Sequence, residues 1–306
     1  MKVAIVTGAN GFVGHHLVEK LSGKGYRVIA MVRNRESFIG AISHLPNVEI
    51  VYCEMSLIEQ LLENIKIDTN NSLFFHLAWT GSSGTARADY QLQLENAKFT
   101  VKAAYVAKKL GCKKIIVAGS ITQLMYRDYL RLDEITPEAV TAYAVGKIAA
   151  ENMLKCVCAE VGLEYNWAYI SNFYGADDPT TNFINFLIEK YSQKETPILT
   201  EAEQLADFVH VEDVAEALIV LAEKGKANNS YYIGYGKPRP LKYFIQFIHQ
   251  RLAPDIESGI GKKKLQGLSV DFEACDYKKM YRDTGFEPKI SFEDGIGNMI
   301  VSFLKV

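Results

Sequence analysis

The chain has 306 residues, of which 48% are hydrophobic and 23% are charged, a composition typical of a globular protein with a sizeable core. Its net charge of −2 predicts no general attraction to nucleic acid or to an anionic membrane. No apolar run approaches the roughly 20 residues that span a bilayer, and the first residues enter a predicted strand without the pattern of a signal peptide. The five cysteines are an odd number and lack metal-ligand spacing. We therefore expect a cytoplasmic protein with free thiols and no metal site.

Patterns typical of strands and helices alternate along roughly the first 170 residues. The predicted strands are short runs rich in β-branched or aromatic residues, at 2–8, 26–32, 47–53, 72–78, 113–119 and 164–170. The predicted helices are amphipathic and end at a glycine, at 12–25, 96–111 and 142–162. This alternation predicts an α/β fold of the Rossmann type, with a doubly wound parallel sheet.

The alternation loosens after these elements, which indicates a second domain. Residues 207–225 restore one strand–helix unit, and most of the remaining chain is rich in turn residues. We expect a dinucleotide-binding domain formed by residues 1–168 plus about 207–236. A smaller, interleaved substrate-binding domain is expected at residues 169–206 plus 237–306.

A glycine-rich turn, "VTGANGFVGHHL", joins the first predicted strand to the first predicted helix. Gly8 permits a tight turn, Gly11 lets a pyrophosphate approach the backbone, and Gly14 lets the helix pack on the sheet. The free N–H groups of the helix N-terminus, beginning at Phe12 and Val13, then face the pyrophosphate. Placed between a strand and a helix, the motif predicts a nicotinamide dinucleotide site.

The choice between NAD and NADP depends on the end of the second strand, about 20 residues beyond the motif. An acid there would bind both ribose hydroxyls of NAD, but this chain has Val32, followed by Arg33. An arginine offers a charge-assisted contact to the 2′-phosphate of NADP, although exposed arginines at strand ends are common. Because Val32 stands where the acid was expected and the cation Arg33 follows it, NADP(H) is favoured over NAD(H).

The segment "TAYAVGK" places Tyr143 four residues before Lys147 on a predicted helix, so both side chains lie on one face. A tyrosine can give or take a proton at a carbonyl or hydroxyl opposite a hydride carrier. A neighbouring ammonium and an oxidised nicotinamide ring favour its phenolate form. A third donor is expected after the fifth strand, and the residues alone leave Ser120 and Thr122 as alternatives.

The chain resembles the extended short-chain dehydrogenases/reductases, in the group of nucleotide-sugar epimerases, dehydratases and reductases. The resemblance covers nearly the whole sequence. It rests on "TGANGFVG", "HLAW", "ENAKFT", "GSITQLMY", "YAVGK", "SNFYG", "DFVHVEDVAEAL" and "GFEPKIS". In this family the catalytic hydroxyl lies four residues before an aromatic residue that corresponds to Tyr126. The resemblance therefore selects Thr122.

The resemblance also implies binding residues and a nucleoside-diphosphate sugar as substrate. The cofactor contacts that it implies are Glu54, Met55, Leu77, Ala78, Trp79, Asn96 and Ile170, besides Tyr143 and Lys147. The substrate contacts that it implies are Thr80, Thr122, Asn172, Asn182 and Phe183. Relatives pair two copies through the helices near 96–110 and 143–160, so a homodimer is expected, with burial of these helices inside one chain as the alternative.

Three departures from the family pattern narrow the reaction. Gln123 and Leu124 follow the threonine where dehydratases have Asp-Glu, and Leu124 also stands where enzymes that make GDP-fucose have a cysteine. Ala206 replaces an arginine that helps to hold substrate phosphate, a role for which Lys237 or Arg239 are substitutes. We expect an NADPH-dependent 4-ketoreductase of a nucleoside-diphosphate 4-keto-6-deoxyhexose. The alternatives are a 4-epimerase that retains its cofactor and a non-catalytic NADP sensor.

Overall fold

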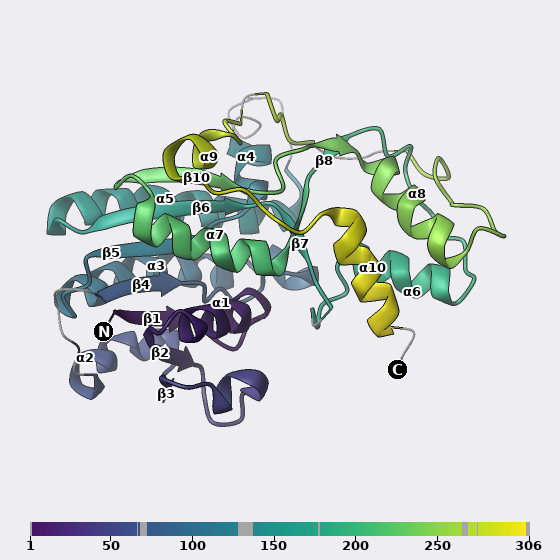
Figure 1. Ribbon diagram of the computed structural model, residues 1–306. Helices are drawn as coiled ribbons and strands as arrows, with labels where there is room; N and C mark the ends of the chain where they lie inside the picture. Colours follow the sequence, from purple (N-terminus) through teal and green to yellow (C-terminus); the bar gives the residue numbers. More distant parts are fainter. Residues whose placement is uncertain are drawn as a thin grey trace.

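The computed structural model describes residues 2–65, 67, 72–127, 137–176, 178–264, 269–273 and 275–303. Its centre is a seven-stranded parallel sheet with the order β10-β6-β5-β4-β1-β2-β3 (Figure 1). The strands are β1 (Val3–Thr7), β2 (Arg27–Val32), β3 (Val48–Tyr52), β4 (Ser72–His76), β5 (Lys114–Ala118), β6 (Glu164–Ile170) and β10 (Asn229–Ile233). The predicted Rossmann-type sheet is confirmed, and β1 to β6 lie within the six predicted strands.

The seventh strand was not predicted as part of this sheet. The sequence placed a strand at the start of residues 207–225, but that strand, β9 (Phe208–His210), pairs with β7 (Asn172–Tyr174) outside the main sheet. Helix α7 (Val211–Lys224) then returns the chain to β10, which pairs with β6 at the sheet edge. The sequence of β10, "NSYYI", begins with two polar residues and has a single β-branched residue, so it is a weaker strand signal than "VAIVT" of β1 or "KIIVA" of β5.

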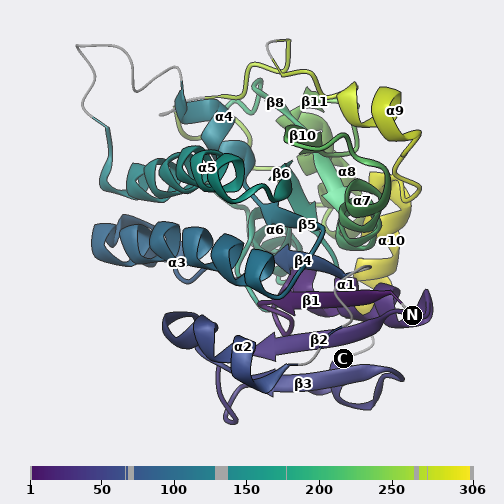
Figure 2. The ribbon, with the colours of Figure 1, turned by 90° about the vertical axis from the view of Figure 1, so that its left-hand side faces the viewer.

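Helices cover both faces of the sheet (Figure 2). Helix α1 (Phe12–Gly23) and α7 pack on one face, and α3 (Tyr90–Lys109) and α5 (Ala142–Val161) pack on the other. Helix α3 begins earlier than predicted because the Asp89 carboxylate caps it, accepting from Leu92 N at 3.1 Å. The short helices are η1 (Gly40–His44), η2 (Met55–Gln60), α2 (Leu61–Asn64), η4 (Gly84–Ala88), α4 (Ile121–Arg127) and η6 (Ala139–Thr141).

A second core lies beyond the carboxyl ends of the strands, among helices α6 (Phe183–Ser192), α8 (Leu241–Leu252) and α10 (Phe292–Phe303) (Figure 1). Its centre is aromatic, with the rings of Phe244 and Phe292 4.7 Å apart. An antiparallel pair, β8 (Leu205–Ala206) and β11 (Arg239–Pro240), joins its loops. We propose the domain division drawn from the sequence, with the difference that Met280 of α9 (Lys279–Thr284) packs in the core of the first domain.

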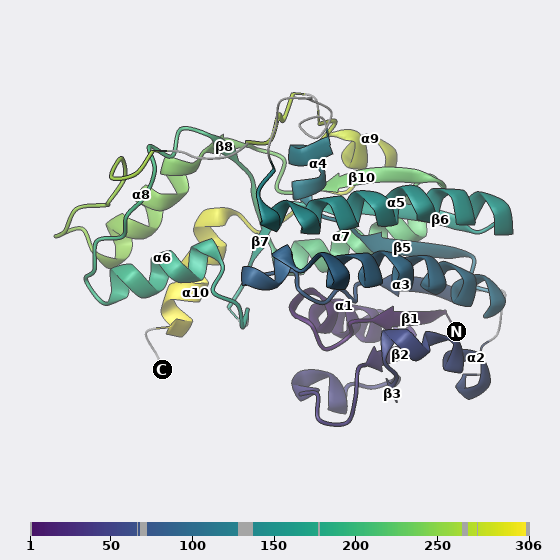
Figure 3. The same cartoon turned by 180° about the vertical axis from the view of Figure 1, so that it is seen from behind.

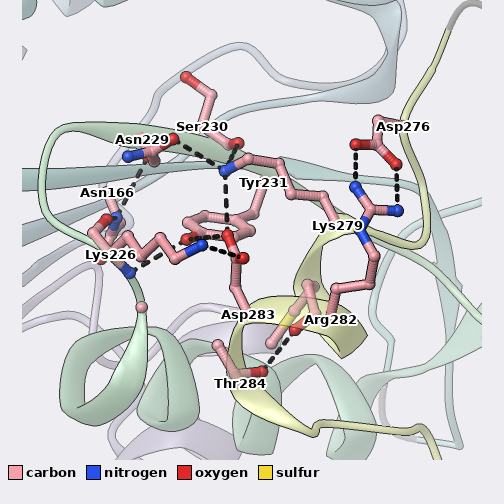
Figure 4. A network of polar contacts seen from close by, with 12 residues as sticks. Asn166, Lys226, Asn229, Ser230, Tyr231, Asp276, Lys279, Arg282, Asp283 and Thr284 are labelled. Carbon is pink, nitrogen blue, oxygen red and sulfur yellow. Dashed lines mark hydrogen bonds and ion pairs between the residues drawn. The ribbon is translucent and has the colours of Figure 1, made fainter.

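Polar contacts attach α9 to β10 (Figure 4). The Asp283 carboxylate accepts hydrogen bonds from Lys226 Nζ at 2.5 Å and from the Tyr231 hydroxyl at 3.0 Å. Lys279 Nζ lies 3.6 Å from the centre of the Tyr231 ring and donates to Asn229 Oδ1 at 2.9 Å. These contacts hold the C-terminal part of the chain against the edge of the main sheet.

The five cysteines are free thiols in the structure, as expected. Cys53, Cys112 and Cys158 are buried, and Cys156 is exposed. Within the described residues, no helix combines the length and apolarity needed to cross a membrane. The same residues contain no group of three His, Cys, Asp or Glu side chains arranged to hold a metal ion.

Candidate active site

The turn after β1 has the geometry that its glycines predict. Gly8 has φ +68°, and a Cβ there would lie 2.8 Å from the backbone nitrogen of Ala78. Gly14 lies in the first turn of α1, where a Cβ would be 2.0 Å from the carbonyl oxygen of Gly8. Gly11 directly precedes the helix and has an extended backbone. The turn is therefore closed by backbone packing, which leaves the N-terminus of α1 open to a pyrophosphate.

A pocket of about 650 Å³ follows this turn along the carboxyl ends of the strands. The predicted residues that line it are Gly8, Gly11, Arg33, Glu54, Met55, Leu77, Ala78, Trp79, Thr80 and Asn96. The sequence did not single out the lining residues Asn10, Met31, Ser37, Cys53, Ser56 and Phe99. Their position in the sequence could have identified them, because most of them lie just past the ends of β1, β2 and β3. The pocket has the place and extent that an adenosine diphosphate group needs.

Six predicted cofactor residues lie outside the lining of this pocket: Tyr143 and Lys147, which are described below, and Phe12, Val13, Gly14 and Ile170. Phe12, Val13 and Gly14 form the first turn of α1, behind the glycine turn. Ile170 is the last residue of β6 and is buried in the core that α1 and α7 share. The Phe12 ring packs against Phe173, and Val13 packs against the same core as Ile170, so none of these three side chains lines the pocket.

Arg33 reaches across the pocket from the end of β2. Its guanidinium donates a hydrogen bond to Thr80 Oγ1 at 3.0 Å. Thr80 is itself held by Asn96, whose amide donates to the Thr80 carbonyl at 2.7 Å and accepts from its N–H at 3.1 Å. Val32 is buried and presents no polar group. Arg33 is thus an exposed cation with a weak neutral partner, placed where a phosphate can replace that partner.

Tyr143 and Lys147 lie on one face of α5 and are both buried. Lys147 Nζ donates to the carbonyl oxygen of Ala118 at 2.6 Å and lies 3.7 Å from the centre of the Trp79 ring. The Trp79 ring meets the Tyr143 ring edge-on, with centroids 6.1 Å apart. Trp79 therefore connects the wall of the dinucleotide pocket to the tyrosine–lysine pair.

Burial controls the protonation of this pair in the structure. It lowers the pKa of Lys147 to about 7, because the charged ammonium loses solvent. It also raises the pKa of Tyr143, while a hydrogen bond from Ser120 and the charge of Arg87 act in the opposite direction. The tyrosine is therefore protonated at neutral pH in the protein alone, and its phenolate form needs a further positive charge nearby.

Thr122 lies in the first turn of α4, beside Ser120. The two hydroxyl oxygens are 2.9 Å apart, and Ser120 Oγ also accepts from the Thr122 N–H at 3.2 Å. The next residue, Gln123, is buried and bonds to the Ser120 N–H at 2.9 Å and to Glu151 at 3.0 Å. Gln123 thus fixes the turn that presents both hydroxyls, which gives a structural reason for an amide at this position.

The predicted substrate residues outside α4 have different surroundings. Asn172 is exposed on β7, and its amide donates to the Asp207 carbonyl at 3.4 Å. Asn182 caps α6, accepting from Asn185 N at 2.9 Å, so its amide is already in use. Phe183 packs against the core of the second domain. Asn172 is therefore the freer polar group on the side of the second domain.

Buried tyrosine and lysine side chains one helical turn apart, next to a groove that fits a dinucleotide, are the arrangement of short-chain dehydrogenases/reductases. The fold and the site together define this class of oxidoreductase. The chain belongs to the NAD dependent epimerase/dehydratase family, whose model matches residues 4–234. The resemblance seen in the sequence motifs is thereby confirmed.

Three known proteins show how this chain is related within the family. It is 24% identical to CDP-abequose synthase of Salmonella typhimurium, over 97% of this chain and 96% of the other. It is 28% identical to dTDP-6-deoxy-L-talose 4-dehydrogenase (NAD(+)) of Aggregatibacter actinomycetemcomitans, over 79% of this chain and 87% of the other. The UDP-N-acetylglucosamine 4-epimerase of Methanobrevibacter ruminantium, solved with UDP-N-acetylmuramic acid, has a TM-score of 0.80 at 22% identity, covering 99% and 98% of the two chains.

Proposed function

We propose that the chain is an NADPH-dependent 4-ketoreductase of a nucleoside-diphosphate 4-keto-6-deoxyhexose, in the synthesis of sugars for surface polysaccharide. The observation that carries the choice of a reductase is Arg33, a cation in the pocket lining beside the buried Val32. A reductase exchanges its cofactor in every cycle and draws on NADPH, whereas a 4-epimerase keeps its cofactor bound. Similarity to a 4-dehydrogenase of a dTDP-6-deoxy sugar supports chemistry at C4.

The residues present fit a nicotinamide dinucleotide, and each has a separate role in the proposed reaction. A Cβ at Gly8 or Gly14 would collide with backbone, so the turn keeps the space that a pyrophosphate needs. When bound, the dinucleotide supplies the hydride for C4. Tyr143 donates the proton to the C4 oxygen, and Thr122 donates a hydrogen bond to that oxygen as negative charge develops. Lys147 holds the ribose of the cofactor and favours the phenolate that remains.

A cation near Ala206 is needed to hold the diphosphate of the proposed substrate. Ala206 in β8 lies directly opposite Arg239 in β11. The Arg239 guanidinium lies 4.3 Å from the centre of the Tyr243 ring and 3.7 Å from the Glu293 carboxylate. This register supports Arg239 as the residue that takes the place of the missing arginine.

The second candidate is a nucleoside-diphosphate-sugar 4-epimerase with retained cofactor. The observation in its favour is the similarity to solved 4-epimerases along the full chain. An NADP sensor without activity is disfavoured, since Thr122, Tyr143 and Lys147 are all present.

One assay separates these candidates. We expect the purified protein to oxidise added NADPH with at least one member of a panel of CDP-, GDP-, dTDP- and UDP-4-keto-6-deoxyhexoses, followed by the absorbance of NADPH. The cofactor that copurifies should be identified in the same preparation. Tightly bound NAD, together with interconversion of an unmodified sugar nucleotide and its C4 epimer, would establish the epimerase instead.

A homodimer is proposed through the outer faces of α3 and α5, which lie side by side (Figure 3). Exposed apolar side chains gather there, with Leu94 60% exposed on α3 and Met153 56% exposed on α5. We expect Leu94→Glu with Met153→Glu to convert a dimer to monomers in sedimentation at micromolar concentration. Ile198→Glu is the matched control, since Ile198 is 69% exposed and lies outside these helices. A wild-type protein that sediments as a monomer would refute the dimer.

A further inference from the structure

Arg87 lies over the ring of Tyr143. It belongs to η4, which packs against η6, α3 and α5. Its guanidinium carbon is 4.5 Å from the centre of the Tyr143 ring, within the range of a cation–π contact. Arg87 is half-buried, so this contact is partly withdrawn from solvent.

Arg87 lacks the partners that a partly buried guanidinium usually has. Its Nε atom is buried and has no hydrogen-bond acceptor among the residues that the structure describes. Within the described part of the chain, no carboxylate forms an ion pair with it, in contrast to Arg27 with Glu49 and Arg282 with Asp276. An unpaired buried donor costs free energy, so a structural role alone gives no account of the position of Arg87.

The Arg87 guanidinium lies over the Tyr143 ring, and the Lys147 ammonium does not. The Lys147 ammonium is directed to the Ala118 carbonyl and the face of Trp79. The other titratable group near this ammonium, His76, is buried and held between Thr7 and Thr100. Its pKa is lowered to about 3, by burial and then by the charge of Lys147, so it is neutral.

The groups that face Tyr143 can be taken element by element. The Trp79 ring, after β4, lies at 84° to the Tyr143 ring, and Ser120, after β5, offers its hydroxyl. Lys147 follows on the same helix and is directed elsewhere. Arg87, from η4, is the charged group over the ring itself.

We propose that Arg87 is a positioning residue of the active site, a fixed cation over the Tyr143 ring that stabilises the phenolate left when this tyrosine gives up its proton. The proposal rests on the proton-donor role of Tyr143 in the proposed function. A cation fixed above the ring is attracted to it more strongly when the ring becomes a phenolate anion, and the cation does not need to move. Proton transfer then requires no rearrangement of this charge.

The ionisation of Tyr143 can be measured without any substrate. With 3-fluorotyrosine incorporated at position 143 alone, fluorine NMR follows its titration in the cofactor-free protein. Fluorination lowers the pKa of the phenol and brings the titration into an accessible range. An opposite charge at this distance lowers a pKa by roughly one unit or more, so we expect Arg87→Gln to raise the midpoint by about one pH unit. Arg87→Lys keeps the charge and should restore most of the shift.

A matched control is available in the same chain. The guanidinium of Arg35 lies 5.0 Å from the centre of the Tyr52 ring, and Arg35→Gln should leave the titration of position 143 unchanged. In the reducing direction Tyr143 must be protonated, so the fall of kcat/KM at high pH should move upward in Arg87→Gln by the same amount as the NMR midpoint. A loss of packing alone would lower activity without moving that fall.

The outcomes separate this proposal from the proposed reaction. An unchanged midpoint in a folded Arg87→Gln protein that still binds NADPH would overturn the role of Arg87. If this variant does not fold, Arg87→Met, which keeps the apolar stem, gives the same measurement. A shifted midpoint with no turnover of any keto sugar would leave the role of Arg87 standing and reject the reductase.

Discussion

Replacing Tyr143 with phenylalanine should lower turnover by roughly 10²–10⁴, the usual contribution of a general acid. The change removes one hydroxyl and keeps the ring, so the contacts of that ring with Trp79 and Arg87 remain. Burial raises the pKa of the Tyr143 hydroxyl in the protein alone, so the tyrosine is protonated at neutral pH and ready to donate. The neighbouring hydroxyls of Ser120 and Thr122 are too weak as acids to replace the Tyr143 phenol as the proton donor.

The measurement is single-turnover reduction of the accepted keto sugar, with the NADPH dissociation constant determined separately. We expect Tyr143→Phe to bind NADPH nearly as the wild type does, since the cofactor pocket is lined by other residues. Thr122→Val serves as a graded comparison and should cost less, because it removes one oriented donor and not the proton. Wild-type turnover in Tyr143→Phe would exclude the proposed mechanism.

The fold was largely accessible from the sequence because its strongest signals are local. Six short apolar runs that alternate with amphipathic helices predicted six of the seven strands of the sheet. The glycine turn predicted where a pyrophosphate approaches. The edge strand β10 was not assigned to the sheet, since a tyrosine-rich run can pack in many settings. Its place follows from α7, which returns the chain to the free edge of β6.

The sequence predicted individual residues of the candidate site, but it predicted less well how these residues lie relative to one another. Gly8, Gly14 and the Tyr143–Lys147 pair follow from spacing along a single element. Arg87 and Trp79 reach the same tyrosine from the chain after β4, and a single sequence has no signal for such contacts. For Asn182, in contrast, a local signal in the sequence indicated a structural role. An asparagine just before a predicted apolar helix is typical of a cap, and capping is the role its side chain has.

Arg33→Ala should weaken NADPH binding by roughly 10–100-fold and leave NADH binding nearly unchanged. Hydrogen bonds to a charged group contribute about 1.5–3 kcal/mol, and about 1.4 kcal/mol corresponds to a tenfold change in affinity. In the structure the Arg33 guanidinium donates to the neutral Thr80 hydroxyl at 3.0 Å. That exposed bond is weaker than a contact to the 2′-phosphate, so the arginine gains by exchanging partners.

Calorimetric titration of both cofactors, at one fixed ionic strength because salt screens an exposed charge, measures this discrimination. Arg35→Ala is the matched control: it removes a neighbouring cation that lies over Tyr52 and outside the pocket lining. If position 33 only supplied general positive charge, Arg35→Ala would weaken NADPH binding to a similar extent. An equal loss of affinity for NADPH and NADH in Arg33→Ala would mean that this arginine serves the pyrophosphate or the pocket wall. The preference for NADP(H), and with it the main argument for a reductase over an epimerase, would then have to be abandoned.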